Sequence, residues 1–325
     1  MALLRRGGGE RQARLRHHAG RAQPQHRPGR VPGRALSLPV WPTALTRVAG
    51  VIGDPIRHSL SPVLHNAAFR ALELDWAFFA FEVPEGEAPD AIAGMRALGL
   101  DGLSVTKPHK AAVAGLVDRL SPTAERLAAV NVVVRQGTVL VGDNTDGQGF
   151  LDALRLDQGF DPAGRRCVVR GAGGAGRAVI LALAEAGAAD VVVVAGRSPE
   201  KAATGAALAG AVGRVASAEE AGDADLVVNA TSVGMGGEPA EAVVDPSLLG
   251  PGQLVVDLVY PVTPFVDAAR GQGATAVNGL GMLIHQAAHA FRLWTGEDAP
   301  REAMSAAALA ALAGLAPADA RADPR

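Results

Sequence analysis

Four short polar segments lie at or beside the ends of apolar runs that have the character of β-strands. They are residues 53–62, 104–110, 129–131 and 142–147. Together they carry hydroxyl groups, an amide, lysine ammonium groups and a carboxylate. In an α/β fold, ligands bind at the ends of the strands. This set of groups suits a small polyhydroxylated substrate and a reaction in which a proton is transferred.

A glycine-rich turn, Gly171-Ala172-Gly173-Gly174-Ala175-Gly176, indicates a second kind of chemistry. It follows the apolar run at 167–169 and precedes a helical pattern. In a dinucleotide-binding turn, Gly171 would permit the tight bend, Gly173 the approach of a pyrophosphate, and Gly176 close packing of helix on strand. The N–H groups at the helix start would face the phosphates. The alternative is an ordinary glycine-rich turn, but the elements on both sides favour the dinucleotide.

Arg197 and Ser198 indicate which dinucleotide binds. They follow the apolar run 191–195, and no acidic residue occurs between Val191 and Pro199. An acid at this point binds the 2′-hydroxyl of NAD, whereas an arginine accommodates the 2′-phosphate of NADP. We therefore expect NADP(H), with Arg197 and Ser198 at the 2′-phosphate; the alternative is a solvated arginine at a helix start. Arg170, a charge at the end of an apolar strand, has no explanation in the sequence.

These sites need elements that alternate along the chain. We expect strands at 48–52, 76–83, 100–106, 131–134, 138–141, 167–169, 191–195, 226–228 and 254–256. We expect helices at 61–74, 87–98, from Pro108 onward, and at 147–156, 174–186, 199–209, 264–270, 282–294 and 302–315. Such alternation is typical of βαβ units with largely parallel sheets. A chain of 325 residues is also long for one core. The prediction is two α/β domains, the second of Rossmann type.

The composition narrows the class of protein. Cys167 is the single cysteine, which excludes an internal disulfide and fits a reducing compartment. It lies in a predicted buried strand and should be inert. No apolar stretch reaches the roughly 18 residues that a membrane span needs. His65, His285 and His289 form no plausible metal set, and the i,i+4 pair has no evident carboxylate partner. We expect a cytoplasmic protein without a metal.

The first 45 residues contain nine arginines and one acid, so the formal net charge of −2 conceals a basic segment on an acidic body. The segment has few aliphatic residues and should be disordered. It is either an artefact of an upstream start, with the native start near Val40 or Val48, or a tail without function, or an arm that binds nucleic acid. We expect no nucleic-acid partner.

Motifs in order along the chain resemble the shikimate dehydrogenase family, from about Val48 to about Pro300. They comprise His58-Ser59-Leu60-Ser61-Pro62, Thr106 with Pro108 and Lys110, Ala129-Val130-Asn131, Asn144-Thr145-Asp146-Gly147, the glycine turn, Asn229-Ala230-Thr231-Ser232-Val233-Gly234-Met235, Asp257 with Tyr260, and Gly279-Leu280-Gly281-Met282-Leu283 with Gln286. The resemblance implies reduction of 3-dehydroshikimate to shikimate with NADPH, in the biosynthesis of chorismate and aromatic amino acids.

The resemblance also implies roles for single residues. Lys110 and Asp146 would be the catalytic pair. The substrate would be held by Ser59, Ser61, Thr106, Asn131, Tyr260 and Gln286. The cofactor would be bound by Gly171, Ala172, Gly173, Gly174, Ala175, Gly176, Arg197, Ser198, Thr231, Leu258, Gly279 and Met282. Local alternatives are a surface lysine for Lys110, turn or cap roles for the serines and Asp146, and backbone bonding for Asn131.

The family pattern implies a domain plan: a tail at 1–46, a substrate domain at 47–146, an NADP domain at 147–278, helices at 279–312 that return to the substrate domain, and a frayed end at 313–325. The protein would be a monomer or a homodimer. Three departures stand out: Lys107 replaces an apolar residue, Ser104 an asparagine, and the Tyr260–Pro264 loop is about two residues short. A quinate/shikimate dehydrogenase that uses NAD, and a catalytically silent binding paralogue, are the alternatives.

Overall fold

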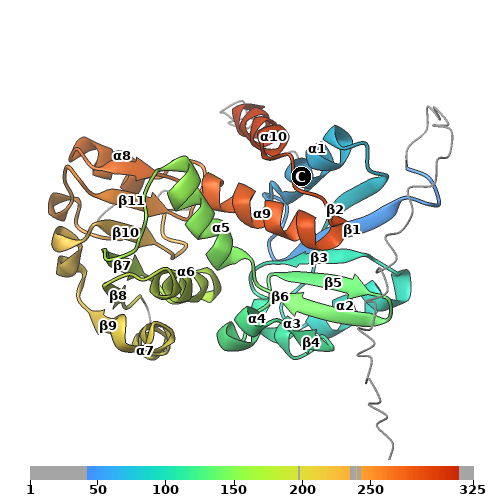
Figure 1. Cartoon of the computed structure of the whole chain (residues 1–325), viewed down its shortest axis with the longest axis horizontal. Coiled ribbons are helices and arrows are strands. Elements are labelled where there is room, and N and C mark those ends of the chain that lie inside the picture. Colours follow the sequence, from blue (N-terminus) through green and yellow to red (C-terminus); the bar gives the residue numbers. More distant parts are fainter. Residues whose placement is uncertain (1–41, 197, 235–238, 240–242, 315–325) are drawn as a thin grey trace, which may run out of the picture. The chain divides into compact units, whose positions relative to one another are not determined.

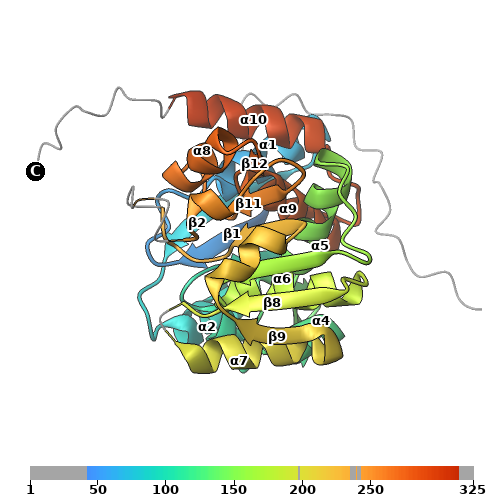
Figure 2. The ribbon, with the colours of Figure 1, turned by 90° about the vertical axis from the view of Figure 1, so that its left-hand side faces the viewer.

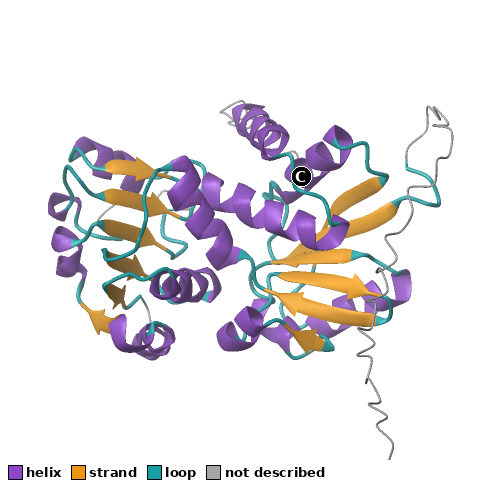
Figure 3. Ribbon diagram, viewed as in Figure 1, coloured by secondary structure: helices purple, strands orange, loops and turns teal. Residues whose placement is uncertain are grey.

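The computed structural model describes residues 42–196, 198–234, 239 and 243–314. They form two six-stranded sheets flanked by helices, so the predicted class of two α/β domains is confirmed (Figure 1, Figure 3). The expectations for Arg197, Met235, the segment before Pro42 and the residues after Gly314 lie outside the described residues. No helix within the described ranges is long and apolar enough to cross a membrane.

The first sheet has the strand order β2-β1-β3-β5-β6-β4. Its elements are β1 (Arg47–Gly53), α1 (Ser61–Ala71), β2 (Trp76–Glu82), α2 (Ala88–Leu98), β3 (Gly102–Val105), α3 (Lys110–Ala114), β4 (Arg119–Leu120), α4 (Pro122–Leu127), β5 (Val132–Gln136) and β6 (Val139–Asp143). Strands β1, β2 and β3 are parallel, but β5 is antiparallel to both β3 and β6. The tight turn at Gly137 requires this pairing of β5 with β6, since parallel strands need a long crossover.

The second sheet is parallel throughout, with the order β12-β11-β10-β7-β8-β9. Its elements are α5 (Asp146–Asp152), which continues as a π-helical segment (Ala153–Asp157), β7 (Arg166–Arg170), α6 (Gly174–Glu185), β8 (Asp190–Val194), α7 (Pro199–Leu208), β9 (Gly213–Ala216), β10 (Leu226–Asn229), β11 (Leu254–Asp257), α8 (Pro264–Gly271) and β12 (Thr275–Val277). Short 3-10 turns lie at Gly210–Val212, Ala218–Asp223 and Pro246–Leu248. Valine-rich strands suit this sheet because both of its faces are buried. Figure 2 shows α7 beside the edge strand β9.

Helix α9 (Leu280–Thr295) packs against the first sheet, and α10 (Arg301–Gly314) packs mainly on α1 and also contacts α9. Ile284, Phe291 and Trp294 of α9 share one apolar cluster with Val51 and Phe69. Helix α9 also lies alongside α5 (Figure 1). Helices α5 and α9 therefore connect the elements of the two sheets. The exact domain boundaries stay a prediction.

Several elements differ from those expected. Strands β4, β9 and β12 and helix α4 are two to six residues long and were not predicted. Such short elements carry too few residues for a periodic pattern. Helix α3 begins at Lys110 and not at Pro108, and the helix expected at 147–156 begins at Asp146 and changes to π-helix. The expectation of largely parallel sheets holds for the second sheet and fails at β5 of the first.

Candidate active site

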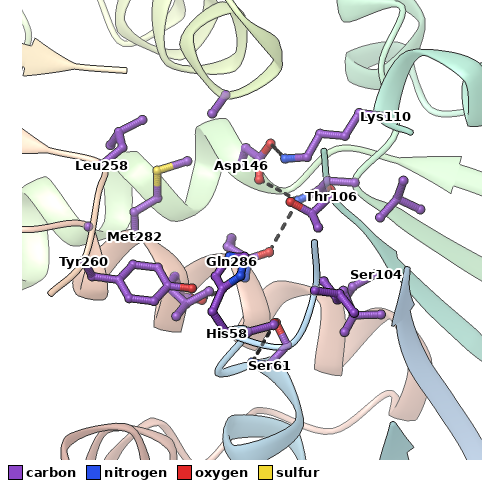
Figure 4. Close-up of a pocket in the computed structure, with 18 residues that line it drawn as sticks. His58, Ser61, Ser104, Thr106, Lys110, Asp146, Leu258, Tyr260, Met282 and Gln286 are labelled. Atoms are coloured by element: carbon purple, nitrogen blue, oxygen red, sulfur yellow. Dashed lines mark hydrogen bonds and ion pairs between the residues drawn. The ribbon is translucent and has the colours of Figure 1, made fainter. Parts of the chain in front are cut away.

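A cavity of about 190 Å³ lies where the carboxyl ends of β1 and β3 face α5 and α9 (Figure 4). All eight residues predicted as catalytic or substrate-binding line it: Ser59, Ser61, Thr106, Lys110, Asn131, Asp146, Tyr260 and Gln286. Of the predicted cofactor residues, Ala175, Leu258, Gly279 and Met282 also reach this cavity. The fold thus collects side chains that are far apart in the sequence.

Lys110 and Asp146 form an ion pair at one side of the cavity. The Nζ atom of Lys110 donates to Oδ2 of Asp146 at 2.5 Å. The side chains are 17% and 6% exposed. Each residue is the first of its helix, α3 for the lysine and α5 for the aspartate. The interpretation of Lys110 as a surface lysine is therefore wrong, and Asp146 is not an N-cap, because Thr145 holds that position.

Asn131 fixes the orientation of the Asp146 carboxylate. Its Nδ2 donates to Oδ1 of Asp146 at 2.8 Å, and its Oδ1 accepts the backbone N–H of Thr145 at 2.8 Å. The Thr145 hydroxyl in turn donates to the backbone carbonyl of Gln286 at 3.1 Å. Both oxygens of Asp146 accept hydrogen bonds, which suits an ionised carboxylate. The alternative role for Asn131, bonding to backbone alone, is therefore wrong.

Hydroxyl groups line the part of the cavity near the start of α1. Ser61 is buried in the first turn of α1, and its backbone N–H donates to the Ser59 hydroxyl at 3.3 Å. The N-cap of α1 is Leu60, so neither serine is the cap. Burial raises the pKa of Tyr260, opposed by a hydrogen bond with the backbone of Leu60. The Tyr260 hydroxyl therefore stays protonated and can donate a hydrogen bond into the cavity.

The glycine turn has the shape that a dinucleotide phosphate requires. Gly171 has φ +97°, and a Cβ there would lie 2.7 Å from Cγ2 of Thr231. A Cβ on Gly176 would collide with the carbonyl oxygen of Gly171, so only glycine permits this packing of α6 on the turn. A Cβ on Gly173, the N-cap of α6, would meet nothing within 4 Å. The first turn of α6 has no acidic residue. These residues therefore fit a bound pyrophosphate.

The same turn lies next to the Lys110–Asp146 pair. A Cβ on Gly174 would lie 3.4 Å from Cδ of Lys110. The start of α6 is therefore directly beside the side chain of Lys110.

Ser198 lies at the other end of the predicted cofactor site, where its hydroxyl caps α7. The hydroxyl accepts a hydrogen bond from the backbone N–H of Lys201 at 3.3 Å and donates one to Glu200 at 2.7 Å. Its contact with a 2′-phosphate stays a prediction.

Some cavity residues were given no role by the sequence. His58, Ser104 and Leu283 line the cavity. His58 and Ser104 lie within the polar segments already singled out, so their position was the available signal. Leu283 lies one turn before Gln286 on α9, and helical spacing could have identified it. Lys107, which departs from the family pattern, is exposed to solvent.

The histidine pair of α9 corrects one expectation, because both members have carboxylate partners. His285 Nε2 lies 3.0 Å from Oδ1 of Asp157, and His289 Nε2 lies 2.7 Å from Oδ2 of Asp152. The partners are distant in sequence, so spacing could not reveal them. No group of three or more metal-binding side chains occurs in the ranges that the structure describes. Cys167 is buried, and burial raises the pKa of its thiol to about 12.

A parallel sheet with a phosphate-binding turn, set beside a buried lysine–aspartate pair, defines the class of two-domain dinucleotide-dependent oxidoreductases. Three family models match segments of this chain. They are the shikimate dehydrogenase substrate binding domain at residues 51–133, the shikimate 5′-dehydrogenase C-terminal domain at 279–309, and the coenzyme F420-dependent NADP oxidoreductase family at 166–261. The chain belongs to the shikimate dehydrogenase family, as the motifs predicted.

Similarity to named relatives spans most of the chain. The chain is 46% identical to the shikimate dehydrogenase (NADP(+)) of Moorella thermoacetica over 283 residues, which cover 81% of this chain and 95% of the relative. The chain is also 46% identical to the shikimate dehydrogenase (NADP(+)) of Geobacter sulfurreducens, and the match covers 83% of this chain and 98% of that relative. The structure of the Thermus thermophilus enzyme in complex with NADP(H) and shikimate matches with a TM-score of 0.73 at 38% identity, covering 82% of this chain and 99% of that one.

Proposed function

We propose that this protein catalyses the reversible, NADPH-dependent reduction of 3-dehydroshikimate to shikimate. The observation that carries the proposal is the Lys110–Asp146 pair, which lies between the phosphate-binding turn and a wall of hydroxyl groups. The names of the relatives and the shikimate and NADP(H) bound to the Thermus structure support it. The reaction places the protein in the biosynthesis of chorismate and aromatic amino acids.

The substrate would be held by the six other predicted polar residues that line the same cavity as the pair. The substrate carboxylate is assigned to Ser59 and Ser61 by the family resemblance, and the positive end of the α1 dipole would favour an anion there. Its hydroxyl and carboxylate oxygens would meet Thr106, Asn131, Tyr260 and Gln286. Each of these side chains can donate a hydrogen bond, which matches a ligand rich in oxygen acceptors.

NADPH, when bound on the glycine turn, supplies the hydride that reduces the ring carbonyl. The protein must then stabilise negative charge on the carbonyl oxygen and deliver a proton to it. The Lys110 ammonium can do both, since a charged donor in a water-poor site stabilises developing charge strongly. Asp146 keeps this ammonium in place, and Asn131 keeps Asp146 in place. We assign the proton that reaches the carbonyl oxygen to the Lys110–Asp146 pair as a whole, because two strongly interacting groups share their protons.

Replacing the lysine tests the catalytic assignment. Lys110→Met should lower kcat by on the order of 10²- to 10⁴-fold, the usual contribution of a positioned acid. The matched control is Lys107→Met, which removes an exposed lysine from the same loop and should leave kcat unchanged. Equal turnover of the Lys110→Met variant and the wild type would refute the catalytic role of the pair.

Two other functions remain as alternatives. An NAD-dependent quinate/shikimate dehydrogenase is kept open by the Listeria monocytogenes enzyme, whose structure holds shikimate and NAD and matches at 34% identity with a TM-score of 0.73. A silent binding paralogue is disfavoured because the buried ion pair is intact. We further propose a cytoplasmic location, supported by the single free cysteine, and the domain plan given above. We propose that the protein acts as a monomer or a homodimer.

A further inference from the structure

Arg170 is a charged residue at the end of a buried strand. It ends β7, in which Cys167, Val168 and Val169 are fully buried. In the sheet register it lies beside Val194 of β8 on one side and Asn229 of β10 on the other. Arg170 is half-buried there, and a guanidinium is costly to desolvate. Its place at the carboxyl edge of the sheet therefore calls for a functional explanation.

The guanidinium reaches toward the end of the neighbouring strand. Nη1 of Arg170 donates to the backbone carbonyl of Ala195 at 3.2 Å, just beyond β8. The next residue, Gly171, donates its N–H to the carbonyl of Val194 at 3.1 Å. The side chain thus lies between two parts of the predicted cofactor site: the phosphate turn that begins at Gly171, and the end of β8, where this fold binds the adenosine ribose.

We propose that Arg170 binds the 2′-phosphate of NADP, in addition to the role that the sequence predicts for Arg197, and so helps this protein to select NADP(H) over NAD(H). Arginine presents five N–H donors in a planar fork. Such a fork can bind more than one acceptor, so a bond to the Ala195 carbonyl is compatible with a bond to a phosphate oxygen. A 2′-hydroxyl offers no charge for the guanidinium to neutralise, so the interaction distinguishes the two dinucleotides. The inference rests on the proposed function only for the identity of the cofactor.

Direct binding of two adenosine fragments, measured by calorimetry on the full chain, tests the proposal without catalysis. The fragments are adenosine 2′,5′-bisphosphate, which has the 2′-phosphate, and adenosine 5′-monophosphate, which lacks it. Arg170→Gln can keep a donor for Ala195 but removes the charge. It should weaken binding of the bisphosphate by about 10- to 100-fold, the usual value of a charged hydrogen bond. Binding of the monophosphate should change less than about twofold.

Two further variants complete the design. Arg170→Lys keeps the charge without the fork and should fall between the wild type and Arg170→Gln. Arg166→Gln is the matched control at the opposite end of β7, where the arginine forms ion pairs with Glu220 and Asp190. It should leave both affinities unchanged, whatever it does to thermal stability.

The outcomes separate this proposal from the proposed function. Equal losses for both fragments in Arg170→Gln, or no loss for either, would overturn the role of Arg170. If the wild type itself binds the two fragments equally, the NADP assignment fails as well. If Arg170→Gln does not fold, the comparison of Arg170→Lys with the wild type decides, because a purely structural role predicts no change in the ratio of the two affinities.

Discussion

Gly149→Ala should separate the two helices that hold the active site. Gly149 lies in α5, one turn after Asp146, where α5 crosses α9. A Cβ at this position would lie 2.5 Å from the backbone nitrogen of Gln286, 2.6 Å from its Cβ and 2.7 Å from its Cα. Since ordinary contact begins near 3.4 Å, the helices must separate by about 0.9 Å. The backbone of Gln286 cannot turn aside as the end of a flexible side chain could.

The shift should affect catalysis more than folding. A misplacement near 1 Å can cost on the order of 10²-fold in rate. The hydrogen bond from Thr145 to the Gln286 carbonyl would also lengthen. Overpacking costs about 1–3 kcal/mol, and alanine in a helix recovers about 1 kcal/mol relative to glycine. We therefore expect a tens-fold loss of kcat/KM, with at most about 2 kcal/mol less stability.

Steady-state kinetics with shikimate and NADP⁺, together with denaturant unfolding, measure both quantities. Gly94→Ala in α2 is the matched control, because a Cβ there would meet nothing within 4 Å. It should stabilise the fold by about 1 kcal/mol and leave kcat/KM unchanged. Native kinetics for Gly149→Ala would refute the claim that the spacing of α5 and α9 sets the geometry of the site.

Three further predictions concern single side chains. Burial lowers the pKa of His65 to about 3 from 6.5. The unfolded chain therefore binds an additional proton as the pH falls through 6.5. Between pH 6.5 and 5 the unfolding free energy of the wild type should fall about 1.6 kcal/mol more than that of His65→Phe. Equal losses for the two proteins in chemical denaturation would contradict this. Asn131→Ala should lower kcat about 10- to 100-fold while the Kd for NADPH, measured by fluorescence, stays unchanged; unchanged kcat would show that Asp146 needs no such support. Burial raises the pKa of the Cys167 thiol to about 12, so Ellman's reagent at pH 8 should label it only after unfolding. Labelling of the native protein at the rate of a free thiol would show that Cys167 is accessible and would contradict this prediction.

The positions of polar segments at strand ends selected the part of the chain that carries Ser59, Thr106, Lys110, Asn131 and Asp146, whereas Tyr260 and Gln286 were selected only by the family motifs. These positions placed Lys110, Asn131 and Asp146 near one another although Lys110 and Asp146 are 36 residues apart. They could not supply the hydrogen-bond pattern, in which Asn131 orients Asp146, since that depends on distances within about an ångström.

Features that depend on helix crossings were beyond the sequence. The contact of Gly149 with Gln286 and the pairing of His285 with Asp157 both arise where α5 and its π-helical extension meet α9. Hydrophobic periodicity gives the buried face of each helix but neither the partner nor the crossing point. The antiparallel direction of β5 could have been predicted, because the tight turn at Gly137 is too short to join two parallel strands.

The most direct test of the account is a steady-state comparison of shikimate and quinate, each with NADP⁺ and with NAD⁺. We predict that kcat/KM is highest for shikimate with NADP⁺, because we assign the hydroxyls of Ser59 and Ser61 to the substrate and propose that Arg170 and Arg197 bind the 2′-phosphate. A higher kcat/KM for quinate with NAD⁺ would contradict both the substrate and the cofactor that we propose.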